Sequence, residues 1–397
     1  MNLRRVGAFI VPAIATVVLS ANAIYVPFDS LRLGAVLLVL TAVQLMLWPR
    51  FRPFRELRLY ALFTVYTFVT LLWTPDPLLG LNTLAPSVDC VIVMVLFGSI
   101  GSHCDTRTVV SGMLCGALIA GGGYSLLSGF PFAYPEDFSY NAVASMYLFG
   151  LVTVALFGAV RGSRLVPLAV TVIFLVCVAA TTSIKTNLGI ALGAGAAFLV
   201  YFRNSLRLLR RTAIPLVMIG AAAAYVGVSS DSIVERVQVG LGRVAAGAVV
   251  LAARGDDINS VGIGFSTREN WETAGIRGWA RSPLLGNGVE AFRADVGVTS
   301  HSTPVDVLYN SGIIGLILFY ACLGSVAWRL LFTRHSLPPP LRAAVLAALS
   351  CYTFVSLSGI MHYNELLLAF VALSAQWLER AGGLDTPPSA SLADGRA

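Results

Sequence analysis

Residues 165–202, LVPLAVTVIFLVCVAATTSIKTNLGIALGAGAAFLVYF, contain two apolar runs separated by the short polar sequence TTSIKT. Each run has roughly the length that a helix needs to cross the ~30 Å hydrocarbon core of a bilayer. Because lipid offers no hydrogen-bond partner to a free peptide group, a segment that crosses it must be helical. The polar sequence contains Lys185, the only lysine of the chain. The stretch therefore predicts two transmembrane helices joined by a short turn that carries one cation.

The same pattern extends over the whole chain of 397 residues, which is 57% hydrophobic and 12% charged. Soluble domains contain about 25% charged residues. The sequence therefore predicts an all-α polytopic membrane protein with about 12 transmembrane helices. The predicted spans are residues 6–27, 31–49, 57–74, 83–101, 107–128, 140–160, 165–182, 187–202, 212–228, 304–328, 343–360 and 362–378.

These spans divide the chain into four parts. Residues 1–228 contain transmembrane helices 1–9, and residues 304–380 contain helices 10–12. Between them lies one long extramembrane loop, residues 229–303. The tail, residues 381–397, is small, polar and proline-containing, which predicts disorder.

The arginines follow the positive-inside rule when both termini are placed in the cytoplasm. Of the 27 basic residues, 18 then lie in inside segments. The net charge of +7 is therefore mainly a topology signal and calls for no nucleic-acid partner. The inside residues are Arg4, Arg5, Arg50, Arg52, Arg55, Arg58, Arg107, Arg161, Arg164, Arg203, Arg207, Arg210, Arg211, Arg329, Arg334, Arg342, Arg380 and Arg396.

Cysteine and histidine are few and scattered. The six cysteines lie in or near the spans without a CxxC pair, and the four histidines form no HxxxH pair. These spacings predict neither a disulfide framework nor a Cys/His metal site.

The long loop contains STRENWETAGIRGWARSP, which has a capping-box spacing at its start and a proline at its end, as an amphipathic helix does. At 100° per residue, Arg268, Trp271 and Trp279 share one face, and Arg277 and Arg281 share the other. An arginine between two indoles suits a sugar phosphate. The alternative is an interfacial helix anchored by tryptophans.

Two further features follow this helix. Gly286 and Gly288, in PLLGNGVEAF, allow a tight turn that could cradle a phosphate, although a GxG pattern alone is weakly specific. His301 lies at the outer end of the next span. A histidine there can accept a proton from a sugar hydroxyl near neutral pH, or it can be an interfacial residue without a chemical role.

The order of these motifs resembles the O-antigen ligase/polymerase superfamily of bacterial envelope glycosyltransferases. The resemblance covers roughly residues 60–330 and implies a GT-C-like bundle with one long periplasmic loop of short helices. It rests on five stretches: LLWTPDPLLGLNTL (71–84), YNAVASMYLFGLVTVALF (140–157), TTSIKTNLGIALG (181–193), RENWETAGIRGWARSPLLGNGVEAF (268–292) and HSTPVDVLYNSGIIG (301–315).

The details of the resemblance point to two related activities. His301 is followed by Gly312 and Gly315 at the spacing found in ligases, but Leu316 departs from the residue types that end that motif. The family's basic residue after a serine is usually arginine. Here it is Lys185, displaced by one position, which resembles the polymerases more closely.

The resemblance implies roles for three residues. Lys185 and Arg268 resemble the basic residues that hold the lipid-linked diphosphate, and His301 resembles the proposed catalytic base. Arg277 and Arg281 are second-tier diphosphate candidates, because the helical pattern points them away from Arg268, and Trp271 and Trp279 are sugar-binding candidates.

The implied function is that of an inner-membrane glycosyltransferase. It would transfer a glycan from undecaprenyl diphosphate to an acceptor sugar hydroxyl on the periplasmic side, with inversion at C1 and with neither metal nor cofactor. A polysaccharide polymerase is the first expectation, and a ligase acting on lipid A-core is the alternative. A transporter of the lipid-linked glycan is a third class, but the spans contain few central charges and no evident repeat.

Overall fold

The computed structural model describes residues 3–24, 30–131, 140–161, 165–181, 183–202, 274–332, 337–357, 359 and 361–383. Within these ranges every regular element is a helix, and no strand is present. The helices are α1 (Leu3–Ile24), α2 (Ser30–Leu47), α3 (Arg55–Val69), the 3₁₀ turn η1 (Thr70–Leu72), α4 (Pro77–His103), α5 (Thr106–Ser128), α6 (Tyr140–Arg161), α7 (Leu165–Ala180), α8 (Ile184–Phe202), α12 (Ala291–Val296), α13 (Thr303–Phe332), α14 (Pro339–Leu357) and α15 (Glu365–Gly383).

Six of these helices are long and apolar enough to cross a bilayer, namely α1, α4, α5, α6, α13 and α14. Two shorter apolar helices, α2 and α7, accompany them. The described residues thus have the architecture of a polytopic helical membrane protein, as the apolar runs predicted. Helices overlap eleven of the predicted spans, and the span 212–228 lies outside the described residues.

Close packing in the bundle depends on small residues. In α5, a Cβ added at Gly112 would lie 2.3 Å from the Phe9 carbonyl oxygen of α1, and one at Gly116 would lie 2.4 Å from that of Ala13. Glycines four residues apart allow two backbones to approach, a recurrent device where lipid provides no hydrophobic drive between helices.

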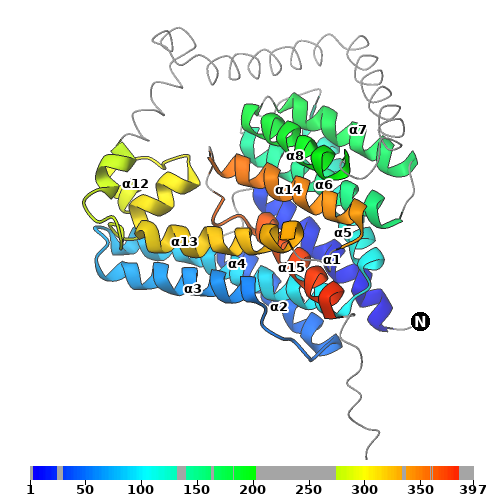
Figure 1. Cartoon of the computed structure of the whole chain (residues 1–397), viewed down its shortest axis with the longest axis horizontal. Coiled ribbons are helices and arrows are strands. Elements are labelled where there is room, and N and C mark those ends of the chain that lie inside the picture. The colour runs from blue at the N-terminus through cyan, green and yellow to red at the C-terminus, as the bar shows by residue number, and fades with distance from the viewer. Residues whose placement is uncertain are drawn as a thin grey trace, which may run out of the picture.

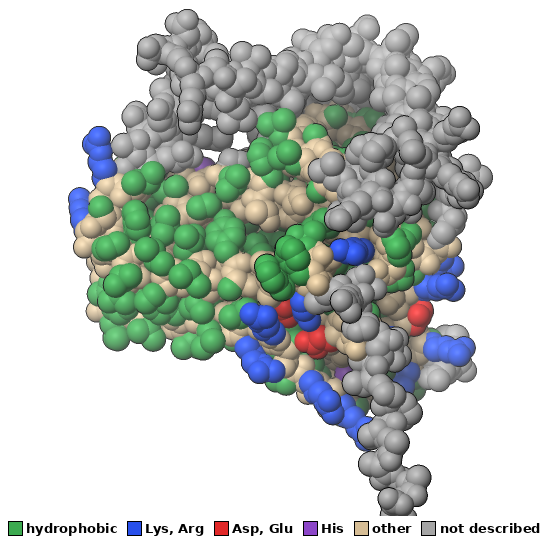
Figure 2. All heavy atoms as spheres, in the orientation of Figure 1, with side chains coloured by type: hydrophobic (Ala, Val, Ile, Leu, Met, Phe, Trp, Pro, Cys, Tyr) green, Lys and Arg blue, Asp and Glu red, His purple; other side chains and the backbone are tan. Residues whose placement is uncertain are grey.

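One end of the bundle gathers basic side chains. Arg329, near the end of α13, pairs with the buried Glu56 of α3 at 2.7 Å. Arg380 of α15 donates to the carbonyl oxygens of Gly101 and Cys104 at the end of α4. Figure 2 shows several basic side chains at this end, whereas hydrophobic side chains cover much of the visible face beyond it. Arg329 and Arg380, two of the arginines that the charge pattern assigned to one side of a membrane, therefore lie at the same end of the bundle.

Helix α4 begins earlier than its predicted span at residue 83. Pro77 occupies its first turn, and the side chain of Asp76 accepts a hydrogen bond from the backbone N–H of Leu79 at 3.0 Å. A proline start behind an aspartate cap favours helix initiation there. As a result, Asp89 lies roughly three turns into the helix and is only 4% exposed. This residue is an exception to the expectation that the spans contain few central charges.

The opposite end of the bundle contains the starts of α4, α6, α8, α13 and α15. Figure 1 shows α12 and its neighbouring coil, in yellow, at the far end from the N-terminus. Residues 274–302 pack there against the end of α3, where the backbone N–H of Val289 donates to Thr70 Oγ1 at 3.0 Å. Most of the predicted site residues in the described part of the chain lie at this end.

Candidate functional site

Helix α13 is interrupted at Gly312, whose φ of 63° and ψ of −166° are not helical. At this interruption, some backbone N–H and C=O groups of α13 form hydrogen bonds with the preceding loop, residues 282–289, instead of within the helix. The Asn287 N–H donates to the Tyr309 carbonyl at 2.8 Å, and the Ile313 N–H donates to the Pro283 carbonyl at 3.0 Å. A Cβ at Gly312 would lie 2.3 Å from the Leu284 carbonyl oxygen. The first glycine of the Gly-x-x-Gly pattern therefore serves to dock this loop into the helix.

The glycines of PLLGNGVEAF have the same structural role. The Gly286 N–H donates to the Ser282 carbonyl at 2.8 Å, and the Gly288 N–H donates to the Asn310 carbonyl at 2.9 Å. Trp73 Nε1 in turn donates to the Gly286 carbonyl at 3.2 Å. The alternative of a phosphate cradle is wrong for these two amides, because both are already used in holding the loop.

His301 precedes α13 and has a left-handed backbone conformation, with φ of 55°. This conformation is uncommon for a residue with a side chain, and such residues cluster at functional sites. The side chain is exposed and faces a cavity of about 270 Å³. Asn141, Ser145, Asn364 and Glu365 supply most of the other polar lining. The structure thus places the predicted base at a polar cavity between α6, α14 and the start of α15.

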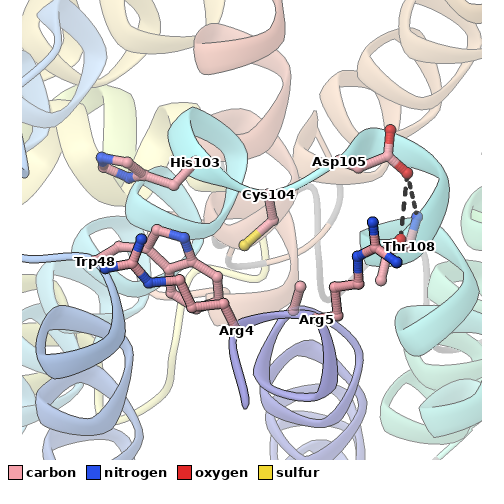
Figure 3. A pocket seen from close by; sticks show the side chains of 8 residues that line it. Arg4, Arg5, Trp48, His103, Cys104, Asp105 and Thr108 are labelled. Carbon is pink, nitrogen blue, oxygen red and sulfur yellow. Dashed lines mark hydrogen bonds between the residues drawn. The ribbon is translucent and has the colours of Figure 1, made fainter. Parts of the chain in front are cut away.

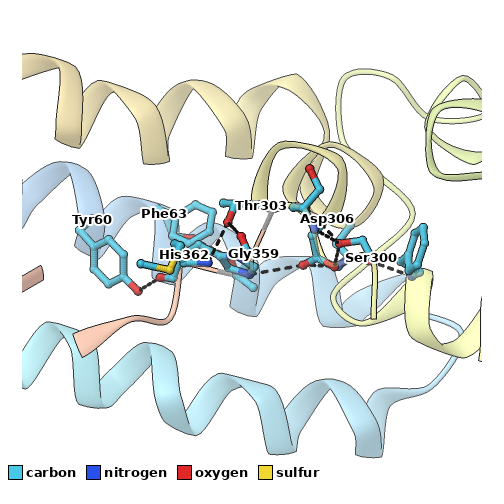
Figure 4. Close-up of polar contacts among 12 residues, drawn as sticks. Tyr60, Phe63, Ser300, Thr303, Asp306, Gly359 and His362 are labelled. Atoms are coloured by element: carbon cyan, nitrogen blue, oxygen red, sulfur yellow. Dashed lines mark hydrogen bonds and ion pairs between the residues drawn. The ribbon is translucent and has the colours of Figure 1, made fainter. Parts of the chain in front are cut away.

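The residues on either side of His301 are anchored in the protein interior (Figure 4). Ser300 Oγ donates to Asp306 Oδ1 at 3.1 Å. Thr303 Oγ1 donates to the Gly359 carbonyl at 2.6 Å and accepts from the Met361 N–H at 2.8 Å. Buried polar groups satisfied in this way fix the backbone, so the unusual conformation of His301 is held from both sides.

Asp306 also contacts His362, which lies in the loop between α14 and α15. Asp306 Oδ2 accepts from Asn310 Nδ2 at 3.2 Å and lies 3.4 Å from His362 Nε2. Both side chains are buried, and because burial disfavours a charged ring, we assign a neutral His362 with its Nε2–H directed at Asp306. This pair was missed by sequence reasoning, because residues so far apart in the chain show no local spacing pattern.

The start of α8 joins the same region. Ser183 Oγ donates to Asn141 Oδ1 at 3.3 Å, and Asn141 lines the cavity at His301. Lys185 is the second residue of α8, and its backbone alone is described. The segment that carries the only lysine therefore begins beside the cavity.

The remaining predicted site residues are not brought to this cavity, as far as the structure describes them. Arg277 is exposed, and Arg281 NH1 lies 3.9 Å from Asp295 Oδ2 in an exposed ion pair. Trp279 Nε1 donates to the Pro283 carbonyl at 2.9 Å, so its indole N–H is used in the fold. Residues 274–279 are helical, as predicted. Arg268 and Trp271 lie outside the described residues.

Comparisons with known proteins identify no relative: no family model matches the chain, and no curated protein matches it.

Proposed function

We propose that this protein is an envelope glycan polymerase of the O-antigen ligase/polymerase type. It transfers a glycan from undecaprenyl diphosphate to the hydroxyl of an acceptor sugar. The observation that carries the proposal is the placement of His301. This histidine has a strained backbone that is anchored on both sides, and its side chain faces a polar cavity beside the segment of Lys185.

In the proposed reaction, His301 accepts the proton of the acceptor hydroxyl as its oxygen attacks C1 of the donor sugar. The bond between C1 and the diphosphate oxygen breaks on the opposite face, and undecaprenyl diphosphate leaves with both electrons of that bond. Attack from the face opposite the leaving group inverts C1. No covalent enzyme intermediate, metal or cofactor takes part.

The leaving diphosphate needs positive charge. In the proposal, Lys185 and Arg268 neutralise it, because preorganised cations stabilise charge that develops in a transition state. Lysine acts as a point charge, whereas arginine can form two parallel hydrogen bonds to phosphate oxygens. Arg277 and Arg281 are further candidates for the lipid side of the diphosphate, and Trp271 and Trp279 are candidates for stacking on the sugar.

The proposed topology follows from the basic end of the bundle. It has about 12 transmembrane helices in the bacterial inner membrane, with both termini and the arginine-rich end in the cytoplasm. The cavity at His301 then opens on the periplasmic side, where the donor's glycan is presented. The spatial gathering of Arg329, Arg380 and their partners supports this orientation.

A ligase acting on lipid A-core is the alternative, and one assay separates the two. Purified protein receives an undecaprenyl-diphosphate repeat unit without a second acceptor, and products are separated by chain length. A ladder made by wild type but not by His301→Ala indicates a polymerase. Reaction only after lipid A-core is added indicates a ligase. An equal rate in His301→Ala would refute the catalytic role. Lipid translocation without transfer would favour the transporter.

A further inference from the structure

The cavity at His301 offers a ligand both hydrogen-bond donors and a hydrogen-bond acceptor. Two of its lining residues are asparagines, Asn141 and Asn364. Asn141 Oδ1 accepts from Ser183 Oγ at 3.3 Å, and Asn364 Oδ1 accepts from the Leu367 N–H at 2.8 Å. Both amide oxygens are thus used in the fold, so the Nδ2 groups are the ends that can donate to a ligand.

Glu365 supplies the acceptor. It is partly buried in the first turn of α15 and lines the same cavity. Within the described lining, no lysine or arginine accompanies it. The helix dipole favours a carboxylate at this place, but it does not account for the two amides that line the cavity with it. A partly buried carboxylate needs hydrogen-bond donors, and a ligand with hydroxyl groups would supply them.

This lining suits a neutral sugar. Each sugar hydroxyl both donates and accepts a hydrogen bond, as the lining requires. An anionic ligand would be repelled by Glu365, and an apolar ligand would leave the polar groups unpaired. Val355, Met361 and Leu366 add an apolar wall for the C–H face of a sugar ring. The volume of about 270 Å³ is near the lower end of the ~300–1,000 Å³ range of small-molecule sites, so it suits a terminal sugar rather than a long chain.

We infer that the cavity at His301 is the acceptor subsite and that it binds a neutral sugar through Glu365, Asn141 and Asn364. Two neighbouring hydroxyl groups donate to the two oxygens of the Glu365 carboxylate, and the amide Nδ2 groups donate to sugar oxygens. A uronic acid or a phosphorylated sugar is excluded from this position. The acceptor role rests on the proposed glycan transfer, whereas the binding of a neutral sugar can be measured without it.

A second cavity, at the other end of the bundle, provides a matched control. It has a volume of about 500 Å³, and its one carboxylate is that of Asp105. Figure 3 shows this carboxylate turned toward Thr108, whose N–H and Oγ1 donate to Asp105 Oδ2 at 3.1 Å and 3.2 Å. Asp105 therefore has donors within the protein, where it caps α5. Asp105→Asn makes the same carboxylate-to-amide change as Glu365→Gln, but away from the proposed subsite.

The test is saturation-transfer NMR of the full chain in phospholipid nanodiscs, which contain no sugar detergent. The probes are the methyl glycosides of glucose, galactose and mannose, each compared with the methyl glycoside of its uronic acid. Wild type should bind at least one neutral glycoside about tenfold or more tightly than its uronate, because like charges repel at close range. Glu365→Gln should lower the neutral affinity about fivefold, since hydrogen bonds to a charged group are the stronger ones. It should also bind the uronate nearly as well as the neutral glycoside, whereas Asp105→Asn should behave as wild type does.

Three results would overturn the inference. The first is equal binding of the neutral and acidic glycosides by wild type, and the second is no binding of any neutral glycoside. The third is an equal change in Glu365→Gln and Asp105→Asn. Asn141→Asp adds a further check, because it keeps the oxygen that accepts from Ser183 and replaces the amide donor with a second carboxylate. It should weaken the neutral glycoside about fivefold and still reject the uronate; wild-type affinity in this variant would contradict the subsite.

The ladder assay separates this inference from the proposed function. Glu365→Gln should slow formation of the ladder, and Asp105→Asn should not. A ladder that Glu365→Gln makes at the wild-type rate would overturn the inference and leave the proposed function in place. Binding of a neutral sugar that depends on Glu365, with no ladder in wild type, would support the sugar site and refute the glycan transfer.

Discussion

At the scale of single residues, the conformation of His301 gives a test that separates chemistry from folding. A left-handed backbone costs a residue with a Cβ about 1–2 kcal/mol, a cost that glycine does not have. His301→Gly should therefore abolish glycan transfer and leave the free energy of unfolding within about 1 kcal/mol of wild type. Thermal unfolding in detergent and the ladder assay measure the two effects.

His103→Gly is the control for that variant. His103 ends α4 in a right-handed helical backbone, where glycine costs roughly 1 kcal/mol. The control should lower the melting temperature and leave transfer unchanged. If His301→Gly transfers at the wild-type rate, His301 is not the base.

Asp306 holds the segment before α13, which contains His301, against the protein interior. Asp306→Asn places an amide N–H₂ where Ser300, Asn310 and His362 all direct donors. A buried group left facing a donor costs about 1–3 kcal/mol. We expect this loss of stability together with a fall in kcat at nearly unchanged KM, because the base is mispositioned while the donor site remains. Steady-state kinetics and thermal unfolding check both.

Asp105→Asn is the matched change at the other end of the bundle. Asparagine caps a helix about as well as aspartate does, so this variant should be close to wild type in stability and in kcat. A similar loss in both variants would mean that Asp306 has no special connection with His301.

At the scale of elements, the break in α13 holds the loop 282–289 in place at the end of the bundle that contains His301. Gly312→Ala would require a Cβ 2.3 Å from the Leu284 carbonyl oxygen, at a φ of 63°. Since backbone atoms cannot give way cheaply, we expect a destabilisation of about 3 kcal/mol or more. Denaturant or thermal unfolding of the purified protein measures it.

Gly324→Ala is the control in the same helix. No atom lies within 4 Å of a Cβ at Gly324, and alanine favours a helix interior over glycine by up to about 1 kcal/mol. This variant should be as stable as wild type or more stable. A comparable loss of stability in both variants would show that α13 tolerates no added methyl group anywhere. The cost at Gly312 would then not come from its contact with the loop.

The helices themselves were predictable because their apolar runs are long and their interruptions are charged. The start of α4 was not predicted correctly. The apolar run is weaker between Pro77 and residue 83, but the Asp76 cap already initiates the helix at Pro77. Gly286 and Gly288 were considered as a possible phosphate-cradling turn on a weakly specific pattern. These glycines instead complete the hydrogen bonding of a broken helix, and no local spacing rule describes that partner.

At the scale of the whole molecule, the sequence motif singled out His301 as a candidate, but it gave no sign of the Asp306–His362 pair beside it. Asp306 and His362 come together only because α13 and the loop before α15 meet at one end of the bundle. Contacts of this kind depend on tertiary packing. The arginine pattern assigned Arg329 and Arg380 to one side of the membrane, and the two lie at the same end of the bundle; the sidedness itself stays a prediction.

The orientation of the bundle is the prediction on which the proposed function depends as a whole. Arg50, after α2, and Ala294, in α12, are both exposed and lie at opposite ends. Single variants Arg50→Cys and Ala294→Cys are treated with a membrane-impermeant maleimide in spheroplasts. The native cysteines are buried or half-buried and keep the background low. Ala294→Cys should be labelled directly, and Arg50→Cys only after the membrane is permeabilised. The reverse pattern would place the cavity of His301 in the cytoplasm, away from a donor at the outer leaflet, and would rule out the proposed glycan transfer.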